Sequence, residues 1–171
     1  MTPLPAPLGG TEFVAWRLSR AKFGTTWDSG EGAFLYGGRW NSKGVRTVYC
    51  SIDPATAILE VAVHTGFKVL DAVPHVLTAL TITDPSTIHV VHGDQVPDPN
   101  WLRPCPESDS QRRFGDALLT RHKFVAIPSA VSTRSWNLIF VGTIAAGAYA
   151  VRSQERFALD PRLHPPTTSK T

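Results

Sequence analysis

Hydrophobic and polar residues alternate over short stretches of this chain, a pattern typical of half-buried β-strands. The first such stretch, residues 13–18 (FVAWRL), predicts a strand with Arg17 on the opposite face from Trp16. Other apolar or β-branched runs of similar length predict strands at 45–51, 74–82, 87–91, 124–128, 137–141 and 156–159. Short strands are therefore the commonest predicted element.

Two helices are predicted between these strands. Asp53 and Pro54 form an N-cap followed by proline at the first helical position, and the apolar run after them ends at Gly66. Residues 110–122 predict a second, amphipathic helix, which follows a proline-rich connection at 97–106. Strands that outnumber helices in this order predict the α+β class.

The other segments are rich in glycine or proline. Glycines recur through residues 24–44, which predicts an irregular segment whose backbone can approach a ligand closely. The prolines and glycines near the start, and the sequence HPPTTSKT at the end, predict flexible segments at 1–12 and 164–171. We therefore expect a single domain over residues 13–163, which suits a chain of 171 residues.

The composition excludes several classes of protein. Charged residues make up 18% of the chain, which is too few for a coiled coil or a charged scaffold, and 42% hydrophobic residues suffice for a core. The 17 Lys and Arg residues against 14 Asp and Glu residues give a net charge of +3. The longest basic run is Arg112 and Arg113, so we expect no direct binding of nucleic acid.

The sequence also bears on the location of the protein in the cell and on metal binding. No apolar stretch is long enough to span a membrane, and the first residues lack the pattern of a secretory signal. Cys50 and Cys105 lack CxxC spacing, and the six histidines lack HxxxH and HExxH spacing, so no metal site is predicted. We expect a protein of the reducing cytoplasm with no membrane partner.

Glu60 is the most informative of the five glutamates. It lies in the strongly apolar predicted helix, between Leu59 and Val61. Burying a carboxylate without a partner is costly, so a glutamate at this position needs a reason. The helix alone leaves two interpretations open: a functional carboxylate, or one that faces solvent or pairs with His64 one turn later.

Arg39 lies in a second candidate segment, residues 37–41 (GGRWN). An arginine in a glycine-rich loop can present its guanidinium fork to a phosphate or a carboxylate. The loop lacks the Lys-Ser/Thr pair of a P-loop and the GxGxxG of a dinucleotide fold. A Gly-Gly turn with Arg39 in solvent and Trp40 closing the core is an equally open interpretation.

Tyr49 and Ser129 are weaker candidates. Tyr49 lies on a predicted strand, where its ring could stack on an aromatic ligand or belong to the core. Ser129, in residues 127–130 (IPSA), follows a predicted strand but lacks the GxSxG elbow of a hydrolase nucleophile. A hydrogen-bonding role is therefore favoured over nucleophilic attack for this serine.

Taken in chain order, these segments resemble the RES-domain family, which is named for an arginine, a glutamate and a serine. The resemblance covers residues 13 to 163. It is carried by WR at 16–17, GGRWN at 37–41, VYCS at 48–51, AILE at 57–60, IPSA at 127–130, NLI at 137–139 and LDPRL at 159–163. It implies an ADP-ribosyltransferase-like fold, in which a mixed, split β-sheet with few helices surrounds an NAD cleft.

The resemblance also implies a function. RES proteins are typically toxins of bacterial type II toxin–antitoxin pairs, and the cognate antitoxin carries a helix-turn-helix DNA-binding domain. We expect the chain to degrade NAD⁺ by cleaving the nicotinamide–ribose bond, by hydrolysis or phosphorolysis, with NAD⁺ as substrate and no cofactor. By matching motif positions, Glu60, Arg17 and Ser129 would be catalytic, and Arg17, Arg39, Tyr49 and Ser129 would bind NAD⁺.

The chemistry of NAD⁺ cleavage suits this set of residues. The nicotinamide is already a cationic leaving group, so one carboxylate, Glu60, can stabilise the oxocarbenium-like ribose without a general acid. Arg17 and Arg39 would neutralise the pyrophosphate, and Tyr49 would pack against the nicotinamide or ribose. Ser129 would orient the substrate or Glu60.

Two other functions are alternatives to NAD⁺ degradation. Some family members modify a protein, so the chain could be a protein ADP-ribosyltransferase toxin. A non-catalytic domain that binds a partner or nucleic acid is an alternative of another class.

The chain departs from the family pattern at two places. Family members often carry an aromatic residue where this chain has Leu18, and an Asn-Pro pair where it runs FVG at 140–142.

Overall fold

Seven strands form one mixed sheet in the computed structural model, which describes residues 12–102 and 108–163. The strands are β1 (Phe13–Arg20), β2 (Val48–Ser51), β3 (His75–Ile82), β4 (Ile88–Val90), β5 (Phe124–Pro128), β6 (Trp136–Phe140) and β7 (Tyr149–Phe157). Their order across the sheet is β4-β5-β6-β2-β1-β3-β7, with β4 and β5 parallel and the other neighbours antiparallel. The predicted α+β class and mixed sheet are confirmed.

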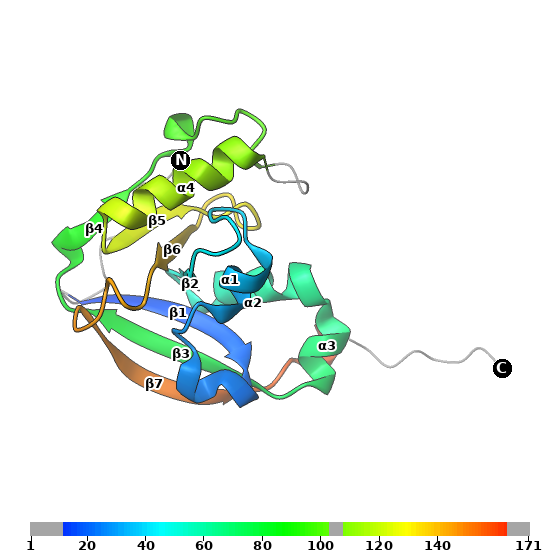
Figure 1. Cartoon of the computed structure of the whole chain (residues 1–171). Helices are drawn as coiled ribbons and strands as arrows, with labels where there is room; N and C mark the ends of the chain where they lie inside the picture. The colour runs from blue at the N-terminus through cyan, green and yellow to red at the C-terminus, as the bar shows by residue number, and fades with distance from the viewer. Residues whose placement is uncertain (1–11, 103–107, 164–171) are drawn as a thin grey trace.

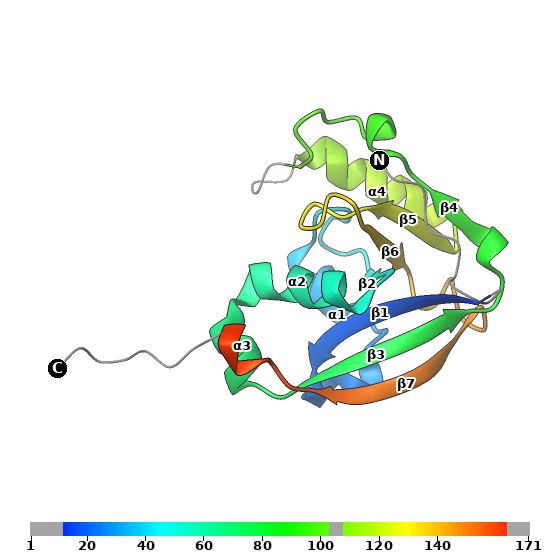
Figure 2. The ribbon, with the colours of Figure 1, turned by 180° about the vertical axis from the view of Figure 1, so that it is seen from behind.

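The sheet is split between β1 and β2. These strands register at one pair, Trp16 opposite Ser51, whereas β1 and β3 register along their whole length. Figures 1 and 2 show the result: β1, β3 and β7 form one curved layer, and β5 and β4 lie above it with helix α4. The two halves of the sheet therefore diverge from a single narrow junction.

Four α-helices lie among the described residues: α1 (Glu31–Tyr36), α2 (Pro54–Thr65), α3 (Phe67–Ala72) and α4 (Asp109–Arg121). Short 3-10 segments are η1 (Ala21–Thr26), η2 (Pro85–Thr87), η3 (Gly93–Gln95) and η4 (Pro161–Leu163). Helix α2 begins and ends where the sequence predicts, because Asp53 caps its first turn and Gly66 terminates it with a φ of 76°. No helix in the described ranges is long and apolar enough to cross a membrane.

Three predictions of local structure were wrong. Residues 24–44, expected to be irregular, contain α1, whose Phe34, Leu35 and Tyr36 are exposed and so give no amphipathic pattern. Helix α3 follows α2 after the single residue Gly66 and was not predicted. The last strand is β7 rather than 156–159, because β7 is a mostly exposed edge strand with few apolar positions.

The predicted terminal segments, 1–12 and 164–171, fall almost wholly outside the described residues, as does Cys105, and these expectations stay predictions. The buried residues among those described form three clusters. The first contains Ala15, Cys50, Leu80, Leu138 and Phe140. The second lies under α4 and contains Trp40, Trp101, Leu119, Ile127 and Ile139, and the third lies under α2 and α3 and contains Leu18, Ala62, Leu70 and Leu159.

Candidate active site

Glu60 lies on α2, and its carboxylate is held against the sheet. Its Oε1 atom accepts a hydrogen bond from the Ser129 hydroxyl at 2.8 Å and another from the Asn137 side-chain amide at 2.6 Å. His64, one turn further along the helix, is exposed. The Glu60 carboxylate therefore has partners outside its own helix, Asn137 in β6 and Ser129 in the loop after β5.

Ser129 follows β5 and is fully buried. Its hydroxyl donates to Glu60 and accepts from the backbone amides of Val131 at 3.2 Å and Ser132 at 3.0 Å. A hydroxyl has one proton and two acceptor sites, so all of its hydrogen-bonding capacity is in use. The Ser129 hydroxyl is therefore fully engaged by the Glu60 carboxylate and by the backbone of its own loop.

Asn137 and Ser51 belong to the same network, and no role was predicted for either of them. Asn137 lies in β6 opposite Ser51 of β2, and the Ser51 hydroxyl donates to the Asn137 amide oxygen at 2.8 Å. Both residues are buried. The signal in the sequence was a single amide in the otherwise apolar strand WNLIF, since a buried amide needs partners.

Asp53 connects the start of α2 to the loop that carries Ser129. Its carboxylate accepts from the amide of Thr56 at 2.8 Å and from the hydroxyls of Thr56 at 2.7 Å and Ser135 at 2.6 Å. The Ser129 amide in turn donates to the Ser135 carbonyl at 3.1 Å. Burial acts to raise the pKa of Asp53, but hydrogen bonds from Ser135 and Thr56 outweigh it and hold the pKa below its ordinary value.

Replacing Asp53 by alanine should lower the free energy of unfolding by about 1–2 kcal/mol, because the cap and the link to Ser135 are lost together. Because the pKa of Asp53 is lower in the folded state, its contribution is present above the unfolded value of about 3.9 and is lost as pH falls through the folded value. Urea titrations at pH 7 and at acidic pH measure both effects. Asp84→Ala, which removes the exposed cap of η2, is the matched control and should cost less.

Arg17 spans the split in the sheet. Its Nη1 atom donates to the Tyr49 carbonyl at 2.7 Å, and among the described residues its buried Nε atom has no partner. Burial lowers the pKa of Arg17, while Cys50 and Asp28 act in the opposite direction. The Arg17 guanidinium thus supplies a hydrogen bond between β1 and β2 where the two strands have no backbone pairing.

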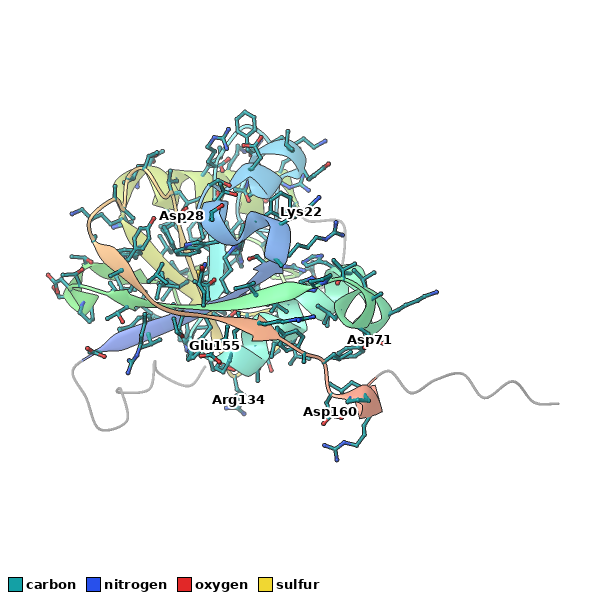
Figure 3. All side chains as sticks on the ribbon, turned by 90° about the horizontal axis from the view of Figure 1, so that it is seen from below. Lys22, Asp28, Asp71, Arg134, Glu155 and Asp160 are labelled. Atoms are coloured by element: carbon teal, nitrogen blue, oxygen red, sulfur yellow. The ribbon has the colours of Figure 1, made fainter. Side chains whose placement is uncertain are left out.

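The structure places Arg17 beside Tyr49, Cys50 and Asp28 rather than at the Glu60 carboxylate. Figure 3 shows Asp28 on the side of the sheet that η1 covers, and Arg134, in the loop after Ser129, on the opposite side. Cys50 is buried, and burial raises the pKa of its thiol to about 12, so it stays protonated at neutral pH.

The GGRWN segment is a turn, closed by a bridge between Gly38 and Asn41. Asn41 is fully buried. Its side-chain amide nitrogen lies within hydrogen-bond distance of three backbone carbonyls, those of Ala33, Ser42 and Val45. The expectation that Trp40 closes the core is confirmed, since it is buried against Trp101 with ring centroids 5.8 Å apart. The motif contains Asn41, but the sequence alone does not predict that it organises the turn.

Arg39 is half-buried, and its Nη1 atom donates to the Trp101 carbonyl at 2.6 Å. The solvent-facing arginine of the alternative interpretation is therefore wrong. The turn and the loop at 97–102 are joined through this side chain. Among the residues that the structure describes, no three His, Cys, Asp or Glu side chains gather as metal ligands would.

Tyr49 joins the turn to β2. Its hydroxyl donates to the Asn41 side-chain oxygen at 2.7 Å and accepts from the Trp40 amide at 3.1 Å. A Cβ atom at Gly38 would lie 2.6 Å from this hydroxyl, which explains the glycine at that position. Tyr49 and Ser51 share one face of β2, so this short strand connects the turn of Arg39 to the Glu60 network.

Comparison with known proteins identifies the family of this chain. A family model for the RES domain matches residues 14–160. A curated protein, Toxin Res from Photorhabdus laumondii, is 31% identical over 127 residues, which are 74% of this chain and 80% of that protein. The crystal structure of the M. tuberculosis MbcT-MbcA toxin–antitoxin complex contains a chain that is 18% identical and matches with a TM-score of 0.61.

The match to that crystal structure covers 86% of this chain and 85% of the other, and it confirms the expected ADP-ribosyltransferase-like fold. The family assignment stands on separate evidence. The RES family match spans the sheet and the segments that hold Glu60, and the curated relative matches most of the chain at more than 30% identity. This chain belongs to the RES domain family.

Proposed function

We propose that this protein is the toxin of a type II toxin–antitoxin pair and that it degrades NAD⁺ by cleaving the nicotinamide–ribose bond. Family membership and the name of the curated relative support the toxin assignment. The observation that carries the chemistry is the Glu60 carboxylate, which two buried donors, Ser129 and Asn137, hold in a fixed place. In this proposal NAD⁺ is the substrate, and no cofactor takes part.

Glu60 would stabilise the positive charge that develops on the ribose. Cleavage of the bond to nicotinamide moves an electron pair onto the pyridine ring, so the departing group leaves neutral and needs no proton. The ribose is left oxocarbenium-like, and a fixed carboxylate close to it lowers the barrier by electrostatic stabilisation. The same carboxylate can orient an attacking water or phosphate, and Ser129 keeps it in position.

Arg17 and Arg39 are the cations that we assign to the pyrophosphate. Arg17 lies in the split between the halves of the sheet, and Arg39 lies on the turn beside Tyr49. Each donates from its Nη1 atom to a backbone carbonyl. The Nε atom of Arg17 has no partner among the described residues, and a guanidinium fork suits the two oxygens of a phosphate. The Tyr49 ring would pack against the nicotinamide or the ribose.

Replacing Arg39 by alanine should raise the KM for NAD⁺ by about tenfold, with a smaller change in kcat, because a charge-assisted contact to the non-reacting pyrophosphate is lost. Steady-state kinetics of NAD⁺ cleavage measures both constants. Arg113→Ala, which removes an exposed arginine from α4, is the matched control and should change neither. An unaltered KM in the Arg39 variant would reject the phosphate role.

We further propose that the partner is a cognate antitoxin with a helix-turn-helix DNA-binding domain and that both act in the cytoplasm. The likeness to a chain crystallised in a toxin–antitoxin complex supports a partner of this kind. Expression of the chain alone should arrest bacterial growth and deplete NAD⁺, and co-expression of its antitoxin should restore both. Growth arrest with normal NAD⁺ would show a different target.

Product analysis with and without phosphate tests the proposed reaction and identifies the acceptor. Nicotinamide with ADP-ribose indicates hydrolysis, and nicotinamide with a phosphorylated ADP-ribose indicates phosphorolysis. Transfer of labelled ADP-ribose to a protein would favour the alternative, a protein ADP-ribosyltransferase. No nicotinamide under any of these conditions would overturn the enzymatic assignment.

A further inference from the structure

We propose that the two oxygens of Glu60 have separate tasks: Oε1 is anchored inside the protein, and Oε2 is the oxygen presented to the substrate. Asn137, itself fixed by Ser51, is then a positioning residue of the active site. This inference rests on the proposed function, because it assigns the atoms through which Glu60 would act. Three observations support it.

The first observation is that both donors converge on the same atom. Ser129 and Asn137 both donate to Oε1 of Glu60, and among the described residues Oε2 has no hydrogen-bond partner. Glu60 is half-buried, whereas Ser129 and Asn137 are buried at 0% and 6% exposure. The anchored oxygen therefore faces the protein, and the other oxygen keeps its full capacity to accept a hydrogen bond or face a cation.

The second observation concerns the orientation of the Asn137 amide. An ionised carboxylate accepts hydrogen bonds and cannot donate them, so the nitrogen of the amide must face Glu60. The amide oxygen then points to Ser51, whose hydroxyl donates to it at 2.8 Å. Ser51 and Asn137 are opposite one another in the β2–β6 register, so the backbone fixes the distance between them.

The third observation is that this network crosses three elements. Glu60 comes from α2, Ser51 from β2 and Asn137 from β6, while Ser129 follows β5. The carboxylate is therefore held from β6 and from the loop after β5 rather than from within its own helix. A rotation of the Glu60 side chain would break two hydrogen bonds to buried donors, and leaving such donors unpaired is costly.

Kinetics of nicotinamide release by full-length variants tests this inference. Asn137→Ala should lower kcat by about tenfold or more while the Kd for NAD⁺ stays nearly unchanged, because the carboxylate loses its fixed position but not its charge. Ser51→Ala should lower kcat less, and Ser51→Thr, which keeps the hydroxyl, should restore it. Ser19→Ala removes a buried strand hydroxyl that has no partner among the described residues, and it should leave kcat unchanged.

The outcomes separate this inference from the proposed function. Wild-type protein that releases no nicotinamide would overturn the function, and the assignment of the two oxygens with it. An active wild type whose kcat survives both Asn137→Ala and Ser51→Ala would overturn the positioning role alone. A weaker Kd for NAD⁺ with unchanged kcat would also overturn it, since Asn137 would then bind substrate directly. Because Ser51→Ala is a mild change, it decides the question even if Asn137→Ala does not fold.

Discussion

Glutamine at position 60 should reduce nicotinamide release at least about 10²-fold, because the side chain keeps its size while the negative charge that we assign to stabilising the ribose is lost. The amide oxygen of glutamine can still accept from Ser129 and Asn137, so the fold of the site should be retained. Chromatographic assay of nicotinamide, with wild-type protein assayed in parallel, measures the effect.

Two controls show whether the loss of turnover comes from the Glu60 charge. Calorimetric titration of the Glu60→Gln variant with NAD⁺ should still detect binding, since the residues that we assign to the pyrophosphate, Arg17 and Arg39, are unchanged. Glu155→Gln changes an exposed glutamate on β7 and should leave turnover at the wild-type level. Wild-type turnover in the Glu60→Gln variant would show that this carboxylate has a structural role only.

Alanine at position 115 should be the most destabilising single substitution in this set. Gly115 lies in α4 where the helix meets the Trp40 backbone, and a Cβ atom there would be 2.0 Å from the Trp40 carbonyl oxygen. Neither the helix nor the turn can yield easily, because the Asp116 side chain also accepts from the Ser42 amide at 3.0 Å. We expect a loss of about 3 kcal/mol or more, which lowers Tm by roughly 6–12 °C.

Gly32→Ala is the matched control for that substitution. Gly32 lies in α1, and a Cβ atom added there would have nothing within 4 Å, so alanine should stabilise the protein by about 0.5–1 kcal/mol. Thermal unfolding followed by circular dichroism measures both variants. A Gly115→Ala protein as stable as the wild type would show that α4 does not pack on the turn as described. The same variant should bind NAD⁺ more weakly, because Arg39 neighbours Trp40.

Most strands and α2 could be predicted from the sequence because their signals are local. The strands that pair inside the sheet have apolar faces, and α2 has its N-cap, its proline and its terminal glycine within the segment. Helix α1 and strand β7 were missed because their apolar residues are few or exposed. Their positions depend on contacts with distant segments, as when Tyr149 donates to Asp28 at 2.6 Å.

The candidate site was predictable to a similar extent. The motif resemblance selected Glu60 and Ser129, and the structure joins them by a hydrogen bond. Ser51 and Asn137 could not be assigned, because their roles depend on the pairing of β2 with β6, which no local pattern encodes. The position of Arg17 in the split could not be predicted either. It depends on where β1 and β2 stop pairing, which is set by the whole sheet and not by the local sequence.

The two departures from the family pattern have identifiable places in the fold. Leu18 is buried in the cluster under α2 and α3, where it packs with Ala62 and Leu70, so it offers no ring for stacking on a ligand. The FVG segment leads out of β6, and a Cβ atom at Gly142 would lie 2.5 Å from the Asp28 carbonyl oxygen. A glycine therefore allows this close passage of the chain.

Release of nicotinamide from NAD⁺ by the purified protein, without its antitoxin, tests the proposed activity directly. We predict that nicotinamide accumulates over many turnovers, in equal amount to the ADP-ribosyl product. The Glu60→Gln protein, folded and able to bind NAD⁺, should release almost none. NAD⁺ that remains intact with the folded wild-type protein would contradict it.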